Sequence, residues 1–364
     1  MRIQPVSDAA FGARVEEFDC AGIDATTAGS LREALHEHQL LIFSGQGHLQ
    51  PGEEVAFCRA IDINGTDVWR DQRNNPWEVF KVEQGNQAGT YQLPDEPAVL
   101  VLGKGEIDHF GLQVTLGGDR DAYGDDQGSQ VLGGGALQWH IDGPFYQFHP
   151  CHYTQMRCIE APSGSGHWLD YGDGSDDRLW CAAGSTAFAS GRIAYDRLSE
   201  ESRNLCRQIR VHYASHPFQT NYALGNSANG LRTIDERAEA DYAAGQDTPG
   251  AAVDDPAALV YPLVWQCPVT GKPALMPHPR CMQTLEIDGR FLGVVEARHQ
   301  VEKWMRPGIN PDSVYVHAWR AGDLVLWNNR SVWHSATGKL SKNDRRVMHL
   351  TAFNGDAPPQ LARL

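Results

Sequence analysis

Two histidines and one aspartate carry the clearest chemical signal in this sequence. His140 and Asp142 are one residue apart, so in an extended strand both side chains would project to the same side. Two imidazoles and a carboxylate on one side of a metal ion leave the other side open, as in non-haem Fe(II) centres that bind a co-substrate and O₂. We predict that His334, far along the chain, supplies the third ligand. His-x-Asp also occurs by chance in surface turns, so the flanking residues must decide.

The flanking residues favour a metal site over a chance occurrence of His-x-Asp. Gly133-Gly134-Gly135 allows the backbone to bend or to pass close to a neighbour just before the motif. Leu324-Val325-Leu326-Trp327 has the composition of a buried strand and leads toward His334. Arg346 follows in an apolar run, where a guanidinium needs an anionic partner and suits a carboxylate bound through two hydrogen bonds. Arg345 is the alternative, because a one-residue shift of register exchanges the two faces of a strand.

These motifs resemble those of the Fe(II)- and 2-oxoglutarate-dependent dioxygenases of the taurine dioxygenase (TauD/TfdA) family. The resemblance rests on His140-x-Asp142, on the Gly-Asp-Leu-Val-Leu-Trp-Asn-Asn-Arg stretch before His334, and on the arginine about a dozen residues later. Near the N-terminus, residues 35–46 match the family's opening helix and strand, so the resemblance covers most of the chain.

The middle of the chain is similar to a divergent, largely fungal subgroup of this family. Tyr261-Pro262-Leu263-Val264-Trp265 and Pro268-Val269-Thr270-Gly271 carry that similarity. The subgroup includes xanthine dioxygenase-like proteins and enzymes of amino-acid-derived secondary metabolism. The resemblance therefore implies a small-molecule substrate: first a small polar, amino-acid-derived metabolite, and as the alternative a purine such as xanthine.

The resemblance also implies the fold and the roles of the site residues. The expected fold is an all-β core with flanking helices, a cupin-like double-stranded β-helix or jelly roll, in one domain over residues 1–364. His140, Asp142 and His334 would bind Fe(II), and Arg346 would pair with the C5 carboxylate of 2-oxoglutarate. With O₂ as the other co-substrate, the enzyme would release succinate and CO₂ and oxidise an unactivated C–H bond. Related halogenases lack the metal carboxylate, so Asp142 favours oxygenation.

One position departs from the family pattern. The family places a threonine that contacts 2-oxoglutarate on the strand after the metal motif, and the matching residue here is Trp168. An indole N–H can donate one hydrogen bond but lacks the acceptor capacity of a hydroxyl. Candidate substrate contacts are polar and aromatic residues near the motif or in the segment where the family binds substrate: Gln138, Phe145, Tyr146 and His109.

Two other classes of function remain open from the residues alone. A His/Asp/His site can also hold zinc and activate water in a hydrolase. A jelly-roll protein with an intact but unproductive site could bind ligands without catalysis. The zinc hydrolase alternative leaves Arg346 and the family-like strands unexplained.

Composition limits the partners and the location. The 364 residues carry 31 Lys and Arg against 46 Asp and Glu, a net charge of −15, which disfavours binding to nucleic acid or anionic membranes. The first residues lack an apolar signal core and no stretch reaches membrane-spanning length, so we expect a cytoplasmic protein, with homo-oligomers possible. The eight cysteines contain no Cys-x-x-Cys pair, and we expect reduced, buried thiols.

Several elements can be predicted from periodicity and capping residues. We expect a helix from about Asp24 to His38, a buried strand over Leu40 to Phe43, and a helix that begins at Pro51. A helix from about Phe291 to Met305 should pack outside the core. Residues 236–256 are rich in Ala, Gly and Asp and are predicted to form a lid or a surface insertion.

Overall fold

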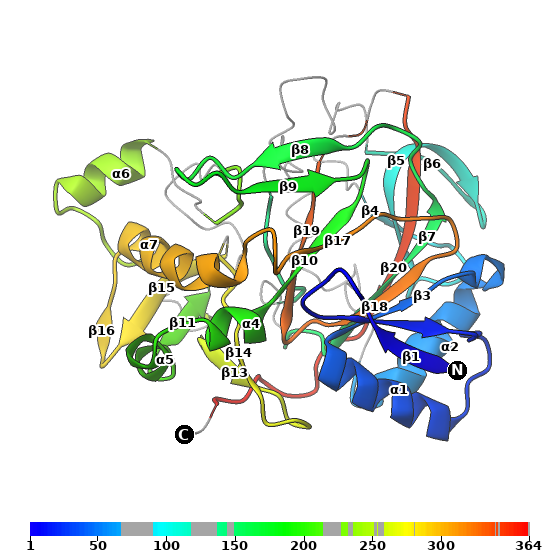
Figure 1. Cartoon of the computed structure of the whole chain (residues 1–364), viewed down its shortest axis with the longest axis horizontal. Helices are drawn as coiled ribbons and strands as arrows, with labels where there is room; N and C mark the ends of the chain where they lie inside the picture. The colour runs from blue at the N-terminus through cyan, green and yellow to red at the C-terminus, as the bar shows by residue number, and fades with distance from the viewer. Residues whose placement is uncertain are drawn as a thin grey trace.

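The computed structural model describes most of the chain, and Figure 1 shows the path of the backbone. The described ranges are 1–66, 90–117, 137–143, 149–213, 227–231, 236–250, 253, 258–279, 281–338, 340, 343 to 362. All structural statements below concern these residues.

A large, mainly antiparallel sheet forms the frame of the molecule. Within the described residues it has nine strands, with β6 paired to β5 beside the main path. In spatial order its strands are β1 (Arg2–Pro5), β2 (Ala13–Glu16), β3 (Leu40–Phe43), β18 (Leu324–Asn328), β7 (Tyr153–Glu160), β20 (Arg346–Ala352), β5 (Leu100–His109) and β4 (Thr90–Gln92), with β6 at Leu112–Leu116. Among the described residues, only the β2–β3 pair of this sheet is parallel.

Smaller sheets complete the β core. A three-stranded sheet has the order β17 (Tyr315–His317), β10 (Thr186–Ser190), β19 (Val332–Ala336). A four-stranded sheet has the order β12 (Leu259–Pro262), β11 (Arg210–Tyr213), β15 (Met282–Ile287), β16 (Arg290–Phe291). Two strand pairs are β13 (Val264–Gln266) with β14 (Pro273–Leu275), and β8 (His167–Asp170) with β9 (Arg178–Cys181).

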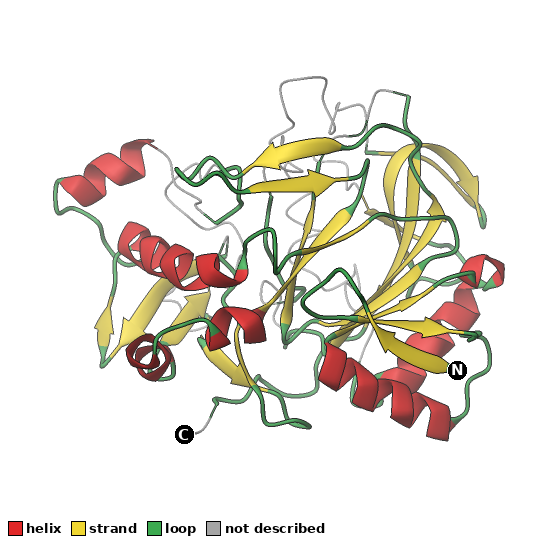
Figure 2. Ribbon diagram, viewed as in Figure 1, coloured by secondary structure: helices red, strands yellow, loops and turns green. Residues whose placement is uncertain are grey.

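The helices lie toward the margins and the strands in the middle (Figure 2). The α-helices are α1 (Ala25–His38), α2 (Pro51–Ile61), α4 (Gly191–Asp196), α5 (Glu200–Cys206), α6 (Glu236–Ala243) and α7 (Val294–Met305), with 3₁₀ turns at Gln46–His48 and Arg306–Gly308. The predicted start of α1 is confirmed, because Asp24 is its N-cap and accepts a hydrogen bond of 2.7 Å from the Thr27 backbone N–H.

The large sheet has two different faces. One face packs on the three-stranded sheet, and side chains from both, including Trp327, Met348 and Phe188, form one buried cluster. The other face is covered by α1 and α2, where Leu35 and Phe57 pack on it. Because side chains alternate along a strand, neighbouring residues of β7 and β20 point into different layers. This arrangement of two facing sheets confirms the predicted all-β core with flanking helices.

The segment around His140 and the predicted lid or insertion lie outside these regular sheets. His140 forms an isolated β-bridge with His334 rather than part of a regular strand. Within the predicted lid or insertion, residues Glu236–Ala243 form α6, and Glu239 on α6 contacts His299 of α7 at 3.1 Å. None of the described helices combines the length and the apolar character needed to cross a membrane.

Candidate metal centre

Reciprocal backbone hydrogen bonds hold the two histidines side by side. His140 N–H donates to the His334 carbonyl at 3.1 Å, and His334 N–H donates to the His140 carbonyl at 3.0 Å. Their imidazole ring centroids are 4.0 Å apart. β19, which carries His334, is fixed in turn by its pairing with β10, where Phe188 stands opposite His334. The sheet therefore places two imidazoles at one point from segments that are distant in sequence.

Asp142 reaches the same point and is supported from two sides. Its carboxylate oxygen Oδ2 lies 3.8 Å from His334 Nε2 and accepts a 2.9 Å hydrogen bond from the Thr154 hydroxyl. The Asn329 side chain accepts from the Asp142 N–H and donates to the Asp142 carbonyl, both at 2.8 Å. Asn329 also donates to the Cys151 carbonyl at 3.1 Å. These hydrogen bonds fix the loop after His140, which is not part of a regular strand.

The orientation of the His140 ring suits metal binding. Its Nδ1 hydrogen-bonds the Gln138 backbone carbonyl at 2.8 Å, so Nδ1 carries the proton and Nε2 is left as the electron-pair donor. A carbonyl partner of this kind is the usual support for a metal-bound imidazole. His278 provides a third imidazole, which is buried, with its ring centroid 6.1 Å from that of His140.

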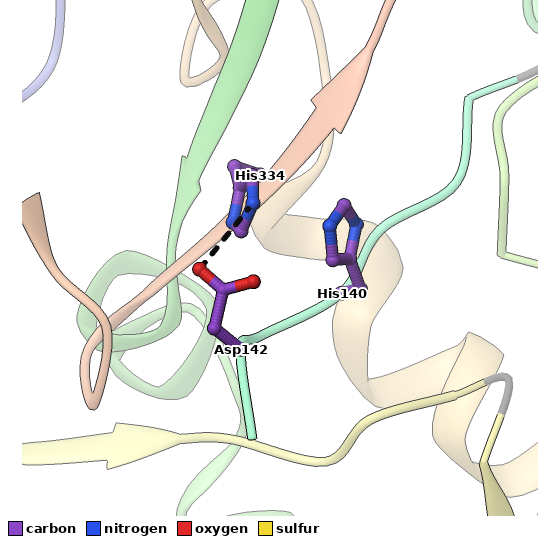
Figure 3. A group of neighbouring side chains, drawn as sticks. All are labelled: His140, Asp142 and His334. Atoms are coloured by element: carbon purple, nitrogen blue, oxygen red, sulfur yellow. Dashed lines mark ion pairs between the residues drawn. The ribbon is translucent and has the colours of Figure 1, made fainter. Parts of the chain in front are cut away.

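The three side chains fit one divalent cation. Their ligand atoms all lie within 4.8 Å of one another, and Figure 3 shows them turned toward a shared space. Burial, followed by the neighbouring His140 and His278, holds the pKa of His334 well below its usual range, so its imidazole is neutral and able to bind metal. Two neutral imidazoles and a carboxylate are the donor set of a facial Fe(II) site.

The structure distinguishes the two candidate arginines. Arg346 shares the inner face of β20 with Met348, is only 7% exposed, and donates through Nε to the Gly184 carbonyl at 2.9 Å. Gly184 has a φ of 60°, and a Cβ there would lie 3.0 Å from the Arg346 Cδ, so glycine leaves room for this side chain. Arg345 points outward instead, with its side chain 51% exposed and its Nε 3.1 Å from Glu160.

Trp168 lies on the outer face of its strand. Its side chain is 55% exposed, and its ring lies on the outer face of β8 at 5.3 Å from that of Trp180. The inner positions of this strand pair are His167 and Leu169, opposite Cys181 and Leu179. This exposure does not favour a contact between Trp168 and 2-oxoglutarate, which stays a prediction.

His109 also lies away from the metal centre. It hydrogen-bonds His349 through their Nε2 atoms at 2.8 Å, and His349 Nδ1 hydrogen-bonds the Glu54 carboxylate on α2 at 2.9 Å. Glu54 forms a buried ion pair with Arg157. This chain of polar groups occupies the helix-covered face of the large sheet, opposite the face that carries Arg346. His109 lines a separate cavity of about 520 Å³ there, and its contact with substrate stays a prediction.

The other predicted substrate contacts are Gln138, Phe145 and Tyr146. Gln138 serves the site through its backbone, since its N–H donates to Ser335 at 2.7 Å and its carbonyl orients His140. A contact between its side chain and substrate stays a prediction. Phe145 and Tyr146 lie outside the described residues.

Sequence reasoning missed the residues that support the ligands. Thr154 lies on a strand whose sequence carries no sign that its hydroxyl meets Asp142. Asn329 stands in a segment recognised as family-like, but its contact with Asp142 depends on the fold. His278 lies between Pro277 and Pro279 and is buried, but the sequence alone does not show that this turn is buried.

Comparisons with known proteins agree with this geometry. The family model described as "Taurine catabolism dioxygenase TauD, TfdA family" matches residues 2–352. The chain is 30% identical to the alpha-ketoglutarate-dependent xanthine dioxygenase xan1 of Schizosaccharomyces pombe, over 99% of this chain and 89% of the relative. It is 29% identical to xanthine dioxygenase xanA of Emericella nidulans, over 96% of this chain and 94% of the relative.

A solved structure supports the fold. The crystal structure of a taurine dioxygenase from Burkholderia xenovorans is similar to this chain with a TM-score of 0.61 at 18% identity, over 100% of this chain and 92% of that one. At this identity the similarity establishes the jelly-roll fold alone, and the predicted fold class is confirmed.

Replacing Thr154 by valine should weaken metal binding. The change removes the hydroxyl that donates to Asp142 while keeping the branched shape, and loss of such a supporting contact typically lowers metal affinity about 10- to 100-fold. Anaerobic titration with Mn(II) measures the Kd. Thr154→Ser keeps the hydroxyl and is the matched control, which should stay near the wild-type Kd. Equal Kd values for Thr154→Val and wild type would show that this hydrogen bond does not support the ligand.

The buried position of His109 predicts a loss of stability in acid. Burial and the neighbouring His349 lower the pKa of His109 to about 4, below its unfolded value near 6.5. Between these values the unfolded chain binds the proton more readily. The free energy of unfolding therefore falls as pH decreases from 6.5 to 4, by about 1 kcal/mol from this group after allowing for solvent screening.

Urea unfolding of wild type and His109→Gln at pH 7, 5.5 and 4 tests this prediction. The variant loses the titrating group, so its free energy of unfolding should depend less steeply on pH across this range. Identical slopes for the two proteins would mean that His109 titrates normally in the folded state.

Proposed function

The chain belongs to the TauD, TfdA family, whose model matches residues 2–352, and on that premise we propose that His140, Asp142 and His334 bind its catalytic iron. The protein is a 2-oxoglutarate-dependent non-haem iron dioxygenase that acts on a small molecule. The observation that carries the site assignment is the convergence of two imidazoles and one carboxylate within 4.8 Å at a buried point of the jelly roll.

Each ligand has a defined task in this proposal. His140 and His334 offer neutral nitrogen donors, and Asp142 offers a negative oxygen that Thr154 holds in place. The bound iron supplies the coupling of 2-oxoglutarate decarboxylation to activation of O₂, with release of succinate and CO₂. A facial set of three protein donors would leave coordination positions for the co-substrates.

Arg346 is the proposed anchor for 2-oxoglutarate. Its Nε donates to the Gly184 carbonyl, which helps to fix the guanidinium, and a guanidinium suits a carboxylate bound through two hydrogen bonds. The surrounding inner-face cluster of apolar side chains excludes water and so strengthens that charge pair. Arg345 is already paired with Glu160 near the surface, which supports Arg346 over Arg345.

An oxidised purine is the first substrate class to test. The relatives that cover 96% to 99% of this chain at 29% to 30% identity are named xanthine dioxygenases. The buried His278 beside the metal ligands is a polar group that could face a nitrogen heterocycle. A small amino-acid-derived metabolite remains the second candidate, supported by the resemblance of the middle segments to enzymes of secondary metabolism.

Family membership favours the oxygenase over the two other classes of function. A zinc hydrolase would not match the 2-oxoglutarate-dependent dioxygenases to which the chain is similar over most of its length. A binding protein without catalysis would not need the ligand set and the anchor together. Both alternatives predict no release of succinate.

Replacing Arg346 by methionine should raise the KM for 2-oxoglutarate by roughly 100-fold or more, because the variant loses a charge-assisted pair in a buried position. Arg345→Met is the matched control, since it removes the same group from the adjacent, exposed position and should change this KM by less than about threefold. Succinate release at varied 2-oxoglutarate concentrations measures both values. The reverse ranking of the two variants would assign the anchor to Arg345.

A substrate panel tests the proposed purine class. Xanthine should accelerate succinate release above the uncoupled rate and should itself gain one oxygen atom by mass spectrometry. Free amino acids and their N-acyl derivatives serve as the second arm of the panel. Stimulation and oxygen gain only in that second arm would overturn the purine assignment and leave the oxygenase class standing.

A further inference from the structure

A cysteine outside the metal centre lies among groups that can activate a thiol. Cys267 begins the turn between β13 and β14, where its N–H donates to the Lys272 carbonyl at 3.0 Å. The turn is at the surface, since the side chain of Val269 in it is 56% exposed, whereas Cys267 is 9% exposed. The sulfur therefore lies directly beneath a solvent-exposed turn.

His36, in the last turn of α1, is positioned to accept the thiol proton. Its Nδ1 is 3.3 Å from the Cys267 sulfur, and its Nε2 is 2.8 Å from the Tyr153 hydroxyl. The Asn328 Oδ1 accepts from the Arg330 N–H, so Asn328 Nδ2 is the atom that faces His36 Nδ1, at 3.3 Å. An amide N–H there requires a lone pair on Nδ1, and the imidazole proton then resides on Nε2. The same lone pair faces the thiol.

Two further groups favour the ionised form of the sulfur. The Thr270 backbone N–H donates to the Cys267 sulfur at 3.4 Å. Arg192 on α4 is 4% exposed, and neither its Nε nor its Nη2 has a hydrogen-bond partner among the described residues. Its Nη1 donates only to the Glu37 carbonyl at 3.4 Å. A buried guanidinium without a carboxylate in contact is costly, and an anion opposite it offsets that cost.

The interaction between Arg192 and the sulfur acts on the pKa of Arg192. Burial lowers the pKa of Arg192, and the nearby Cys267 opposes that decrease. Burial alone would raise the pKa of Cys267, but its hydrogen bonds with His36 and Thr270 lower it to about 6. The other charged groups near this turn are Glu37 and Lys272, which pair with each other at 2.8 Å, and Asp196, which lies near Arg192.

The remaining cysteines provide a contrast within the same chain. All eight lie in the described part of the chain as free thiols and are buried. Burial raises the pKa of Cys158, Cys181 and Cys206 to about 12, and the pKa values of Cys20, Cys58 and Cys151 are also raised. Only a thiolate is strongly nucleophilic, so these six thiols should react slowly.

We propose that Cys267 is a reactive thiol and a modification site, whose sulfur attacks small electrophilic oxidants such as hydrogen peroxide. The sulfur, after giving its proton to His36, attacks one peroxide oxygen, forming an S–O bond as the O–O bond breaks. The sulfur is oxidised to a sulfenic acid and the peroxide is reduced. The departing hydroxide takes the proton from His36 and leaves as water, so His36 returns to its starting form.

Alkylation of the native full-length protein with iodoacetamide from pH 5 to 9, followed by peptide mass spectrometry, tests this proposal. The rate at Cys267 should reach half its maximum near pH 6 and at pH 7 should exceed the rate at every other cysteine by at least about tenfold. The Zn(II)-loaded protein, in which iron chemistry is absent, should form a dimedone-trapped sulfenic acid at Cys267 with hydrogen peroxide.

Two matched variants separate the role of the buried cation from general effects of charge. Arg192→Met should shift the half-maximal pH of Cys267 upward by at least one unit, whereas Lys272→Met, which removes an exposed cation from the same turn, should leave it unchanged. The wild-type profile decides the proposal even if Arg192→Met fails to fold. Native Cys267 that reacts no faster than the other cysteines, or only with a half-maximal pH of 8.5 or above, would overturn it.

Discussion

The pairing of His140 with His334 through two backbone hydrogen bonds is the constraint on which the site depends. This pairing is one isolated bridge, so His140 is not held by the further backbone hydrogen bonds of an extended strand. The loop that follows is held instead by Asn329, which bonds the backbone of Asp142, and by Thr154, which bonds its carboxylate. A few directed hydrogen bonds therefore replace regular secondary structure where the metal ligands converge, and the sheet behind them supplies rigidity.

The two faces of the large sheet divide the molecule into layers with different chemistry. On β20, Arg346 and Met348 face the layer that contains the proposed co-substrate anchor, whereas His349 faces α2 and joins a buried polar chain with Glu54 and His109. Because the alternation of side chains fixes which layer each residue enters, adjacent residues have unrelated roles. The same alternation assigns Arg345 to the surface and Arg346 to the interior.

Sequence reasoning succeeded where chemistry and pattern coincide. The convergence of His140, Asp142 and His334 could be predicted because His-x-Asp, a buried strand before His334 and a later arginine form a specific combination, and the helices could be predicted from caps such as Asp24. The outward direction of Trp168 could not be predicted, because the face of a short strand in a two-stranded sheet depends on a register that sequence does not fix. The contact of His109 with His349 could not be predicted either, because a polar residue beside an aromatic one has the same local pattern on either face of a sheet.

The central claim is that the two histidines and Asp142 hold Fe(II) in a site that also accepts 2-oxoglutarate. Anaerobic optical titration measures this most directly. Adding 2-oxoglutarate to the Fe(II)-loaded protein should produce a weak visible charge-transfer band, and His334→Ala loaded with the same total iron should not show it. A wild-type protein that binds iron but gives no band at saturating 2-oxoglutarate, or a His334→Ala variant with an undiminished band, would contradict the account.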